Sequence, residues 1–121
     1  MGLETGLFIS DDPDDYQVFQ EALDEISKDI VLLSIGDSKK ALRYLRQCQT
    51  LPDYIFVDLT VADSYATILR EMNTDSRLKA IPKIALVDDV SPSGLDHQFF
   101  LIDRTLDFGE LKDALTGFFG A

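Results

Sequence analysis

The sequence predicts an α/β fold with a doubly wound, five-stranded parallel sheet, and two patterns carry this prediction. First, apolar residues at helical spacing fall between short apolar runs along most of the chain. Second, the runs are nearly unbroken and rich in β-branched or aromatic residues, as is typical of strands buried on both faces. The five runs are residues 7–9, 30–35, 54–59, 84–87 and 99–102. Alternation of strands and helices implies right-handed crossovers and the strand order 2-1-3-4-5.

The expected helices are marked by apolar faces and by residues that cap helix ends. Asp12-Pro13 is an N-cap followed by proline at the first helical position, and Asp37 is the predicted cap of the second helix. Residues 88–98 contain Pro92 and Gly94, so the fourth helix is expected to be shortened or lost. The apolar faces of the four full helices lie within residues 18–26, 41–48, 68–72 and 111–118.

Length and composition indicate one globular domain that spans residues 1–121. The chain has 22 acidic and 11 basic residues, and its net charge is −11. This charge would repel phosphates, which argues against nucleic acid and an anionic membrane surface as main partners. The single cysteine excludes a disulfide framework. The sequence shows no signal peptide or membrane span, so the cytoplasm is the expected compartment.

The charge is distributed unevenly along the chain. Residues 1–38 carry ten acidic residues and one basic residue, whereas residues 39–83 carry five acidic and eight basic residues. A basic face of the second expected helix is either simply solvated or docks an acidic partner. Its members are Lys39, Lys40, Arg43 and Arg46.

Acidic residues follow several of the expected strands. Ser10-Asp11-Asp12 comes after the first strand, the third strand contains Asp58, and Asp88-Asp89 follows the fourth. Ligands of open α/β sheets lie beyond the carboxyl ends of the strands. No glycine-rich loop follows the first strand, so a nucleotide phosphate would meet carboxylates. Clustered carboxylates instead suit a hard divalent cation such as Mg²⁺.

Asp58 is the most informative of these residues, because it lies in or at the end of a buried apolar run. A buried carboxylate needs a partner or a metal ion, which favours a functional role. Asp12, Asp14 and Asp15 are explained by their position at a helix N-terminus. Helix capping does not explain Asp11, which lies before the cap.

Several segments in this order and spacing resemble the receiver domain of two-component response regulators, over nearly the whole chain. Ile9-Ser10-Asp11-Asp12-Pro13 is similar to the family's first strand end and acid pair, with Ser10 at the first acid. Residues 54–59 resemble the third strand with its phosphoacceptor aspartate. Residues 107–111 resemble the start of the last helix. The resemblance implies the flavodoxin-like receiver fold, and is closest to the stand-alone members.

The resemblance also implies site residues and partners. Asp58 would be the phosphoacceptor, and Asp11, Asp58 and the backbone carbonyl of Thr60 would bind Mg²⁺, with Asp12 at the rim as a further candidate ligand. Arg104 would contact the phosphate in place of the family's lysine. Metal binding is expected to be weak, because Ser10 removes one acidic ligand. The implied partners are a histidine kinase or phosphotransfer protein and a downstream protein; the chain itself is not expected to be an enzyme.

Two departures leave an alternative open. Ser10 replaces an acid, and Val87 stands where receivers end the fourth strand with Thr or Ser. The alternative is a pseudo-receiver, a binding module that signals without phosphorylation. A Mg²⁺-dependent phosphohydrolase is less favoured, because Thr60 rather than a second acid lies two residues after Asp58.

Overall fold

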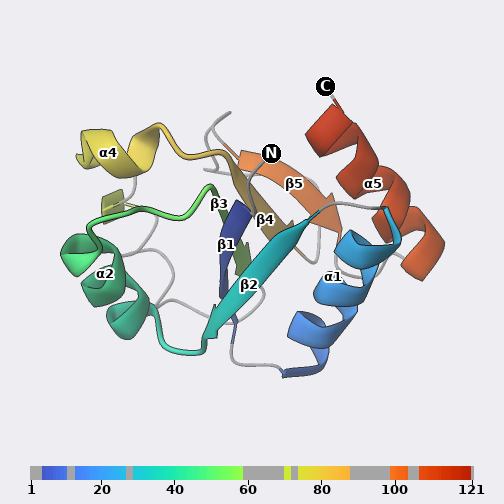
Figure 1. Ribbon diagram of the computed structural model, residues 1–121, viewed down its shortest axis with the longest axis horizontal. Helices are drawn as coiled ribbons and strands as arrows, with labels where there is room; N and C mark the ends of the chain where they lie inside the picture. Colours follow the sequence, from blue (N-terminus) through green and yellow to red (C-terminus); the bar gives the residue numbers. More distant parts are fainter. Residues whose placement is uncertain are drawn as a thin grey trace.

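The structure is an α/β arrangement around one parallel sheet (Figure 1). The computed structural model describes residues 4–10, 13–26, 29–58, 70–71, 74–87, 99–103 and 107–120. Its strands are β1 (Glu4–Ile9), β2 (Ile30–Ile35), β3 (Tyr54–Asp58), β4 (Lys83–Val87) and β5 (Phe99–Asp103). Its helices are α1 (Pro13–Glu25), α2 (Ser38–Gln47), α4 (Ser76–Lys79) and α5 (Phe108–Gly120). None of the helices among these residues has the length and hydrophobicity of a transmembrane span.

The order of the strands is β2-β1-β3-β4-β5, which confirms the predicted topology. All neighbouring strands are parallel. β3 pairs with β1 up to Ile9↔Val57 and with β4 up to Asp58↔Leu86. The chain changes its winding direction between β1 and β3. The carboxyl ends of these two strands therefore form the switch point at which open α/β sheets place their ligands.

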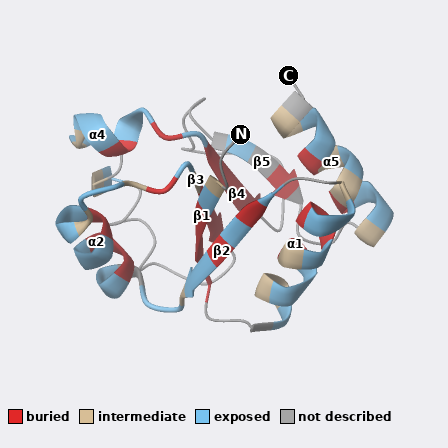
Figure 2. Cartoon of the chain, in the orientation of Figure 1, coloured by how far each residue is buried: buried red, intermediate tan, exposed pale blue. Residues whose placement is uncertain are grey.

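Helices cover both faces of the sheet, and each face has its own apolar core (Figure 2). α1 and α5 pack on one face, and α2 and α4 pack on the other. Side chains of β1 alternate between the cores: Leu7 and Ile9 face α2, and Phe8 faces α1. The rings of Phe8 and Phe19 lie 5.1 Å apart between centroids. This packing on both faces fixes the position of the central strands. It therefore also fixes the carboxyl ends of β1 and β3, which form the switch point.

β2 corrects the prediction that every strand is buried on both faces. Ile30 and Leu32 belong to the core under α1, but Val31 is 50% exposed and Leu33 is 46% exposed. β2 lies at the edge of the sheet and has a neighbouring strand on one side only. The helices on the α2 side of the sheet leave these two side chains in solvent.

The helices α1 and α2 begin where the sequence predicts. α1 begins at Pro13. The Asp37 carboxylate caps α2 by accepting a hydrogen bond of 2.8 Å from the backbone N–H of Lys39. This contact satisfies one of the N–H groups that have no partner within the helix.

Between β3 and β4 the structure adds an element that the sequence analysis did not predict. α4 is a single turn, and the carboxylate of Asp75 caps it by accepting from the backbone N–H of Arg77. Such a short helix has no readable periodicity. Of the helix expected at residues 68–72, the structure describes residues 70 and 71, which are helical. The shortened segment expected at residues 88–98 lies outside the described residues.

Candidate functional site

Asp58 is the last residue of β3 and is completely buried. β1 and β4 flank β3 in the sheet, so the carboxylate lies at the carboxyl end of the central strand. The apolar residues that precede it, Ile55 to Val57, are also completely buried and anchor the strand between the two cores. Burial removes water from an ionised carboxylate, which then needs hydrogen bonds or a cation to remain stable.

Ser10 supplies one such hydrogen bond. Its Oγ donates to Oδ2 of Asp58 over 3.3 Å, and only 3% of the residue is exposed. The backbone N–H of Ser10 donates to the carbonyl of Ile35 at 3.2 Å, which fixes Ser10 to the end of β2. The ends of β1, β2 and β3 thus meet around one buried polar pair.

The sequence analysis assigned little importance to Ser10 and missed this contact. The signal was present in the strand register. Ile9 is paired with Val57, and Ser10 and Asp58 are the next residues of the two parallel chains. A register prediction for the first and third strands would have brought the hydroxyl and the carboxylate together, although 48 positions separate them in the sequence.

The other predicted site residues are not among those that the structure describes. They are Asp11, Asp12, Thr60 and Arg104. Val87 is the last residue of β4, as the resemblance implies. Among the residues that are described, no group of three His, Cys, Asp or Glu side chains is placed to hold a metal ion.

The described part of the site fits a hard cation in its chemistry. Both side chains offer oxygen, which is the donor atom that Mg²⁺ prefers in proteins. The pair of Asp58 and Ser10 carries one negative charge, because the Ser10 hydroxyl is neutral. An acidic residue at position 10 would add a second negative charge. A carboxylate in such a position can also act as a nucleophile toward an electrophilic phosphorus atom.

Lys83 is a second buried charged residue, and the sequence analysis did not single it out. It is 1% exposed, and its Nζ donates to the carbonyls of Ile81 at 2.9 Å and Lys79 at 3.3 Å. Burial lowers the pKa of this amine. Lys83 begins β4, whereas Leu86 of the same strand pairs with Asp58, so Lys83 lies about 10 Å from that end of the sheet. It supports the turn after α4 and is not part of the Asp58 site.

Comparisons with known proteins give matches in structure only. No protein-family model matches the sequence, and no curated protein matches it. The phosphorylated cyanobacterial phytochrome response regulator RcpA matches with a TM-score of 0.77 and 23% identity, over 96% of this chain and 91% of that chain. The chemotaxis response regulator CheY4 of Vibrio cholerae matches with a TM-score of 0.75 and 14% identity, over 97% of this chain and 99% of that chain.

A third similar structure was determined with a metal ion. It is the receiver domain of a sensor histidine kinase from Pseudomonas aeruginosa, with a magnesium ion coordinated in its active-site cleft. It matches with a TM-score of 0.74 and 16% identity, over 99% of this chain and 100% of that chain. At these identities the likeness establishes the fold alone.

Proposed function

We propose that residues 1–121 of this chain, which has the fold of response-regulator receiver domains, form one receiver domain that accepts a phosphoryl group on Asp58. One observation carries the proposal: Asp58 is buried at the carboxyl end of the central strand, at the switch point of the sheet. A buried carboxylate at this position does not stabilise the folded state, because burying an ion costs free energy. Its position is explained by chemistry at that edge of the sheet.

In the proposed reaction, a carboxylate oxygen of Asp58 attacks the phosphorus of a phosphohistidine on a histidine kinase or phosphotransfer protein. The new bond is O–P, the bond that breaks is P–N, and the imidazole leaves with the electron pair and takes up a proton. The product is an acyl phosphate on Asp58. The Ser10 hydroxyl holds the plane of the carboxylate through its bond to Oδ2. Because the carboxylate is already oriented, it loses less conformational entropy on reaching the transition state.

The proposed ligands of Mg²⁺ are Asp58, Asp11 and the backbone carbonyl of Thr60, with Asp12 at the rim. When bound, the ion neutralises negative charge on the carboxylates and the transferring phosphoryl group. Arg104 is proposed to contact the phosphate in place of a lysine. Its planar guanidinium presents paired N–H donors, which suit phosphate oxygens. The proposed output is contact with a downstream protein in the cytoplasm.

The competing function is a pseudo-receiver that signals without phosphorylation, and one observation favours it. Ser10 forms a buried hydrogen bond with Asp58 where an acidic residue would be expected to bind metal. The two functions differ in whether Asp58 reacts, so a direct chemical test separates them.

The test is incubation of the chain with acetyl phosphate and Mg²⁺, followed by intact mass spectrometry. We expect the mass to rise by one phosphoryl group, and the gain to disappear when EDTA removes the metal. Asp58→Asn should show no gain. Asp53→Asn is the matched control, because Asp53 is an exposed acid just before β3, and it should be modified like the wild type. An unmodified wild type at high millimolar Mg²⁺ would favour the pseudo-receiver.

A further inference from the structure

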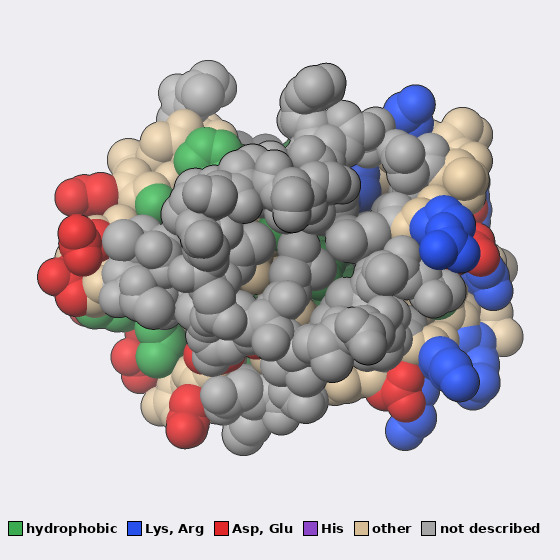
Figure 3. Space-filling view, turned by 180° about the vertical axis from the view of Figure 1, so that it is seen from behind, with side chains coloured by type: hydrophobic (Ala, Val, Ile, Leu, Met, Phe, Trp, Pro, Cys, Tyr) green, Lys and Arg blue, Asp and Glu red, His purple; other side chains and the backbone are tan. Residues whose placement is uncertain are grey.

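Charge separates along the molecule into a basic end and an acidic end. Figure 3 shows Lys and Arg side chains gathered at the end where α2 lies, and Asp and Glu side chains gathered where α1 lies. Helix α2 contains four basic residues and no acidic residue, whereas α1 contains five acidic residues and no basic residue. The basic end therefore stands out in a chain whose net charge is −11.

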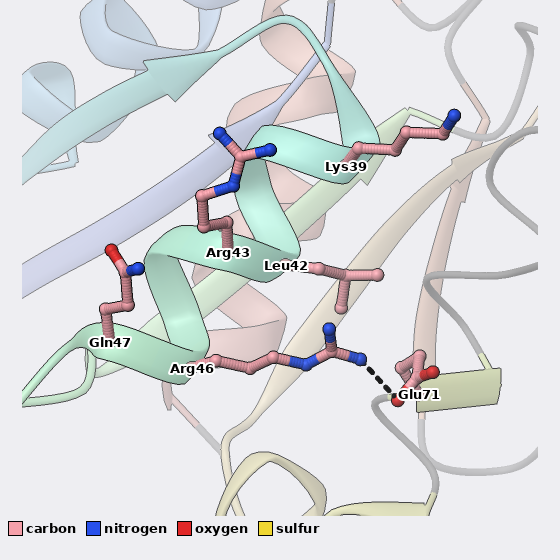
Figure 4. Close-up of a pocket in the computed structure, with 6 residues that line it drawn as sticks. All are labelled: Lys39, Leu42, Arg43, Arg46, Gln47 and Glu71. Carbon is pink, nitrogen blue, oxygen red and sulfur yellow. Dashed lines mark ion pairs between the residues drawn. The ribbon is translucent and has the colours of Figure 1, made fainter.

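A groove runs along the basic face of α2. The residues that line it are Lys39, Leu42, Arg43, Arg46, Gln47 and Glu71 (Figure 4). Lys39, Leu42 and Arg46 project toward the side on which Glu71 lies. Leu42 is only 6% exposed and forms an apolar floor between the basic side chains. The groove thus combines positive charge with a small apolar surface.

One arginine of the groove already holds a carboxylate. Arg46 Nη2 lies 2.9 Å from Oε2 of Glu71, and the side chains are 56% and 41% exposed. An exposed pair of this kind is weak, so a carboxylate from another molecule can replace Glu71 at little cost. Lys39 and Arg43 form no ion pair with any residue that the structure describes. The groove therefore has positive charge left for further carboxylates.

We propose that this groove docks an acidic helical segment of a partner protein. Lys39, Arg43 and Arg46 follow one another at i, i+4 and i+7, a separation of about 6 and 4.5 Å along the helix axis. A second helix with Glu or Asp at the same spacing matches this row, and an apolar residue at its flank contacts Leu42, which lies between Lys39 and Arg46 (Figure 4). The proposal is independent of the chemistry at Asp58.

The charge of the whole chain argues against other anionic occupants. Nucleic acid carries a phosphate every ~1.7 Å along the duplex, and it would bring many charges close to a chain of net charge −11. An anionic membrane presents an extended negative surface to the same chain. A second copy carries the same net charge of −11, which opposes self-association, although its acidic end could face this basic end. Sedimentation of the chain alone that depends on its concentration would therefore overturn the proposal. A short acidic helix, by contrast, brings only a few carboxylates, and these lie close to the basic residues of α2. At such short distances salt screens the attraction little, whereas it screens the repulsion from the distant acidic end of the chain.

The test is NMR titration of the isotope-labelled full chain with a designed peptide of about 16 residues, long enough to be helical. The peptide is rich in Ala, carries Glu at the spacing of the basic row and has one Leu between them. We expect shifts at residues 39–47 and 71, and affinity that falls as salt rises. A peptide with Gln in place of each Glu should not bind. Equal binding of both peptides, or tighter binding of single-stranded oligothymidine or phosphatidylserine vesicles, would overturn the proposal.

Two double variants with equal net charge give the decisive comparison. Lys39→Gln with Arg43→Gln should weaken binding of the Glu peptide at least about threefold. Arg77→Gln with Lys112→Gln removes two basic residues outside the groove, on α4 and α5, and should leave the affinity unchanged. Lys39 and Arg43 are exposed, so Lys39→Gln with Arg43→Gln should unfold at the urea concentration of the wild type. The control variant loses the ion pair between Lys112 and Glu25, so the same denaturation identifies the urea-free conditions in which all three proteins are folded and their affinities are compared. The same loss of affinity in both would show that net charge, not the groove, attracts the peptide.

Discussion

Ser10 and Asp58 form the buried polar pair on which the site depends. Ser10→Ala leaves the carboxylate without this donor and should lower the free energy of unfolding by about 1–3 kcal/mol. Ser10→Thr keeps the hydroxyl and is the control. Urea denaturation at neutral pH measures both, and an unchanged midpoint for Ser10→Ala would show that the hydrogen bond has no energetic weight.

Ser10→Asp tests the metal site from the opposite direction. A second carboxylate beside buried Asp58 repels it, so the metal-free variant should be less stable than the wild type. The added ligand charge should raise the affinity for Mg²⁺. Because a ligand stabilises the folded state in proportion to RT ln(1 + [L]/Kd), Mg²⁺ should raise the unfolding midpoint more in Ser10→Asp than in the wild type. Equal stabilisation of the two proteins by Mg²⁺ would contradict a metal site at this pair.

Lys83 predicts a pH dependence of stability whose sign follows from its burial. Its pKa is lowered in the folded chain, so the folded state binds fewer protons than the unfolded state between the lowered value and about 10.4. The cost of burying the charge is fully present below the folded pKa and is relieved as pH rises through this window. The unfolding free energy of the wild type should therefore rise relative to Lys83→Met as the pH increases from neutral toward the ordinary lysine pKa of about 10.4. Exposed Lys39→Met should track the wild type, and a wild-type curve parallel to that of Lys83→Met would refute the lowered pKa.

At the scale of elements, α1 protects the open edge of β2. The Gln20 amide donates to the carbonyl of Ile30 at 3.1 Å and accepts from the N–H of Leu32 at 3.3 Å. The Tyr16 hydroxyl donates to the carbonyl of Leu32 at 3.2 Å. The amide of Gln20 thus takes the place of a peptide group of a neighbouring strand. These contacts blunt an edge that would otherwise pair with another chain.

Gln20→Ala should therefore lower stability and promote self-association. Loss of the two hydrogen bonds to β2 should cost about 1–3 kcal/mol, and the bared edge carries the exposed apolar residues Val31 and Leu33. Urea denaturation and analytical ultracentrifugation measure the two effects. Gln17→Ala is the control, because among the residues that the structure describes the Gln17 side chain hydrogen-bonds only to Glu21 of its own helix. Identical behaviour of the two variants would refute the protective role.

Apolar runs and cap residues in the sequence predicted most of the helices and strands, but not how far each one is buried. All five predicted strands are present, because unbroken apolar runs are what two-sided burial requires. The exposure of Val31 was not predicted, because an edge strand can have the same apolar run as a central strand. Cap residues located the starts of α1 and α2, whereas the single turn of α4 is too short for periodicity to reveal.

At the scale of the whole molecule, the topology brings together residues that are distant in the sequence. The strand order predicted that the ends of the first and third strands meet, and Asp58 does lie beside Ser10, the residue that follows β1. The hydrogen bond from Ser10 was not predicted, because β1 and β3 are apolar on both faces, and such continuous apolar runs do not by themselves reveal the register that sets Ser10 beside Asp58. The metal ligands Asp11 and Thr60 and the phosphate contact Arg104 remain predictions of the resemblance.

The central claim is that Asp58 is the residue that carries the phosphoryl group. The most direct measurement is borohydride reduction of the acetyl phosphate-treated chain, which converts an aspartyl phosphate to homoserine, followed by peptide mapping. We expect homoserine at position 58 and at no other aspartate. Homoserine at another aspartate, or an unreduced chain under conditions that modify a known receiver, would contradict it.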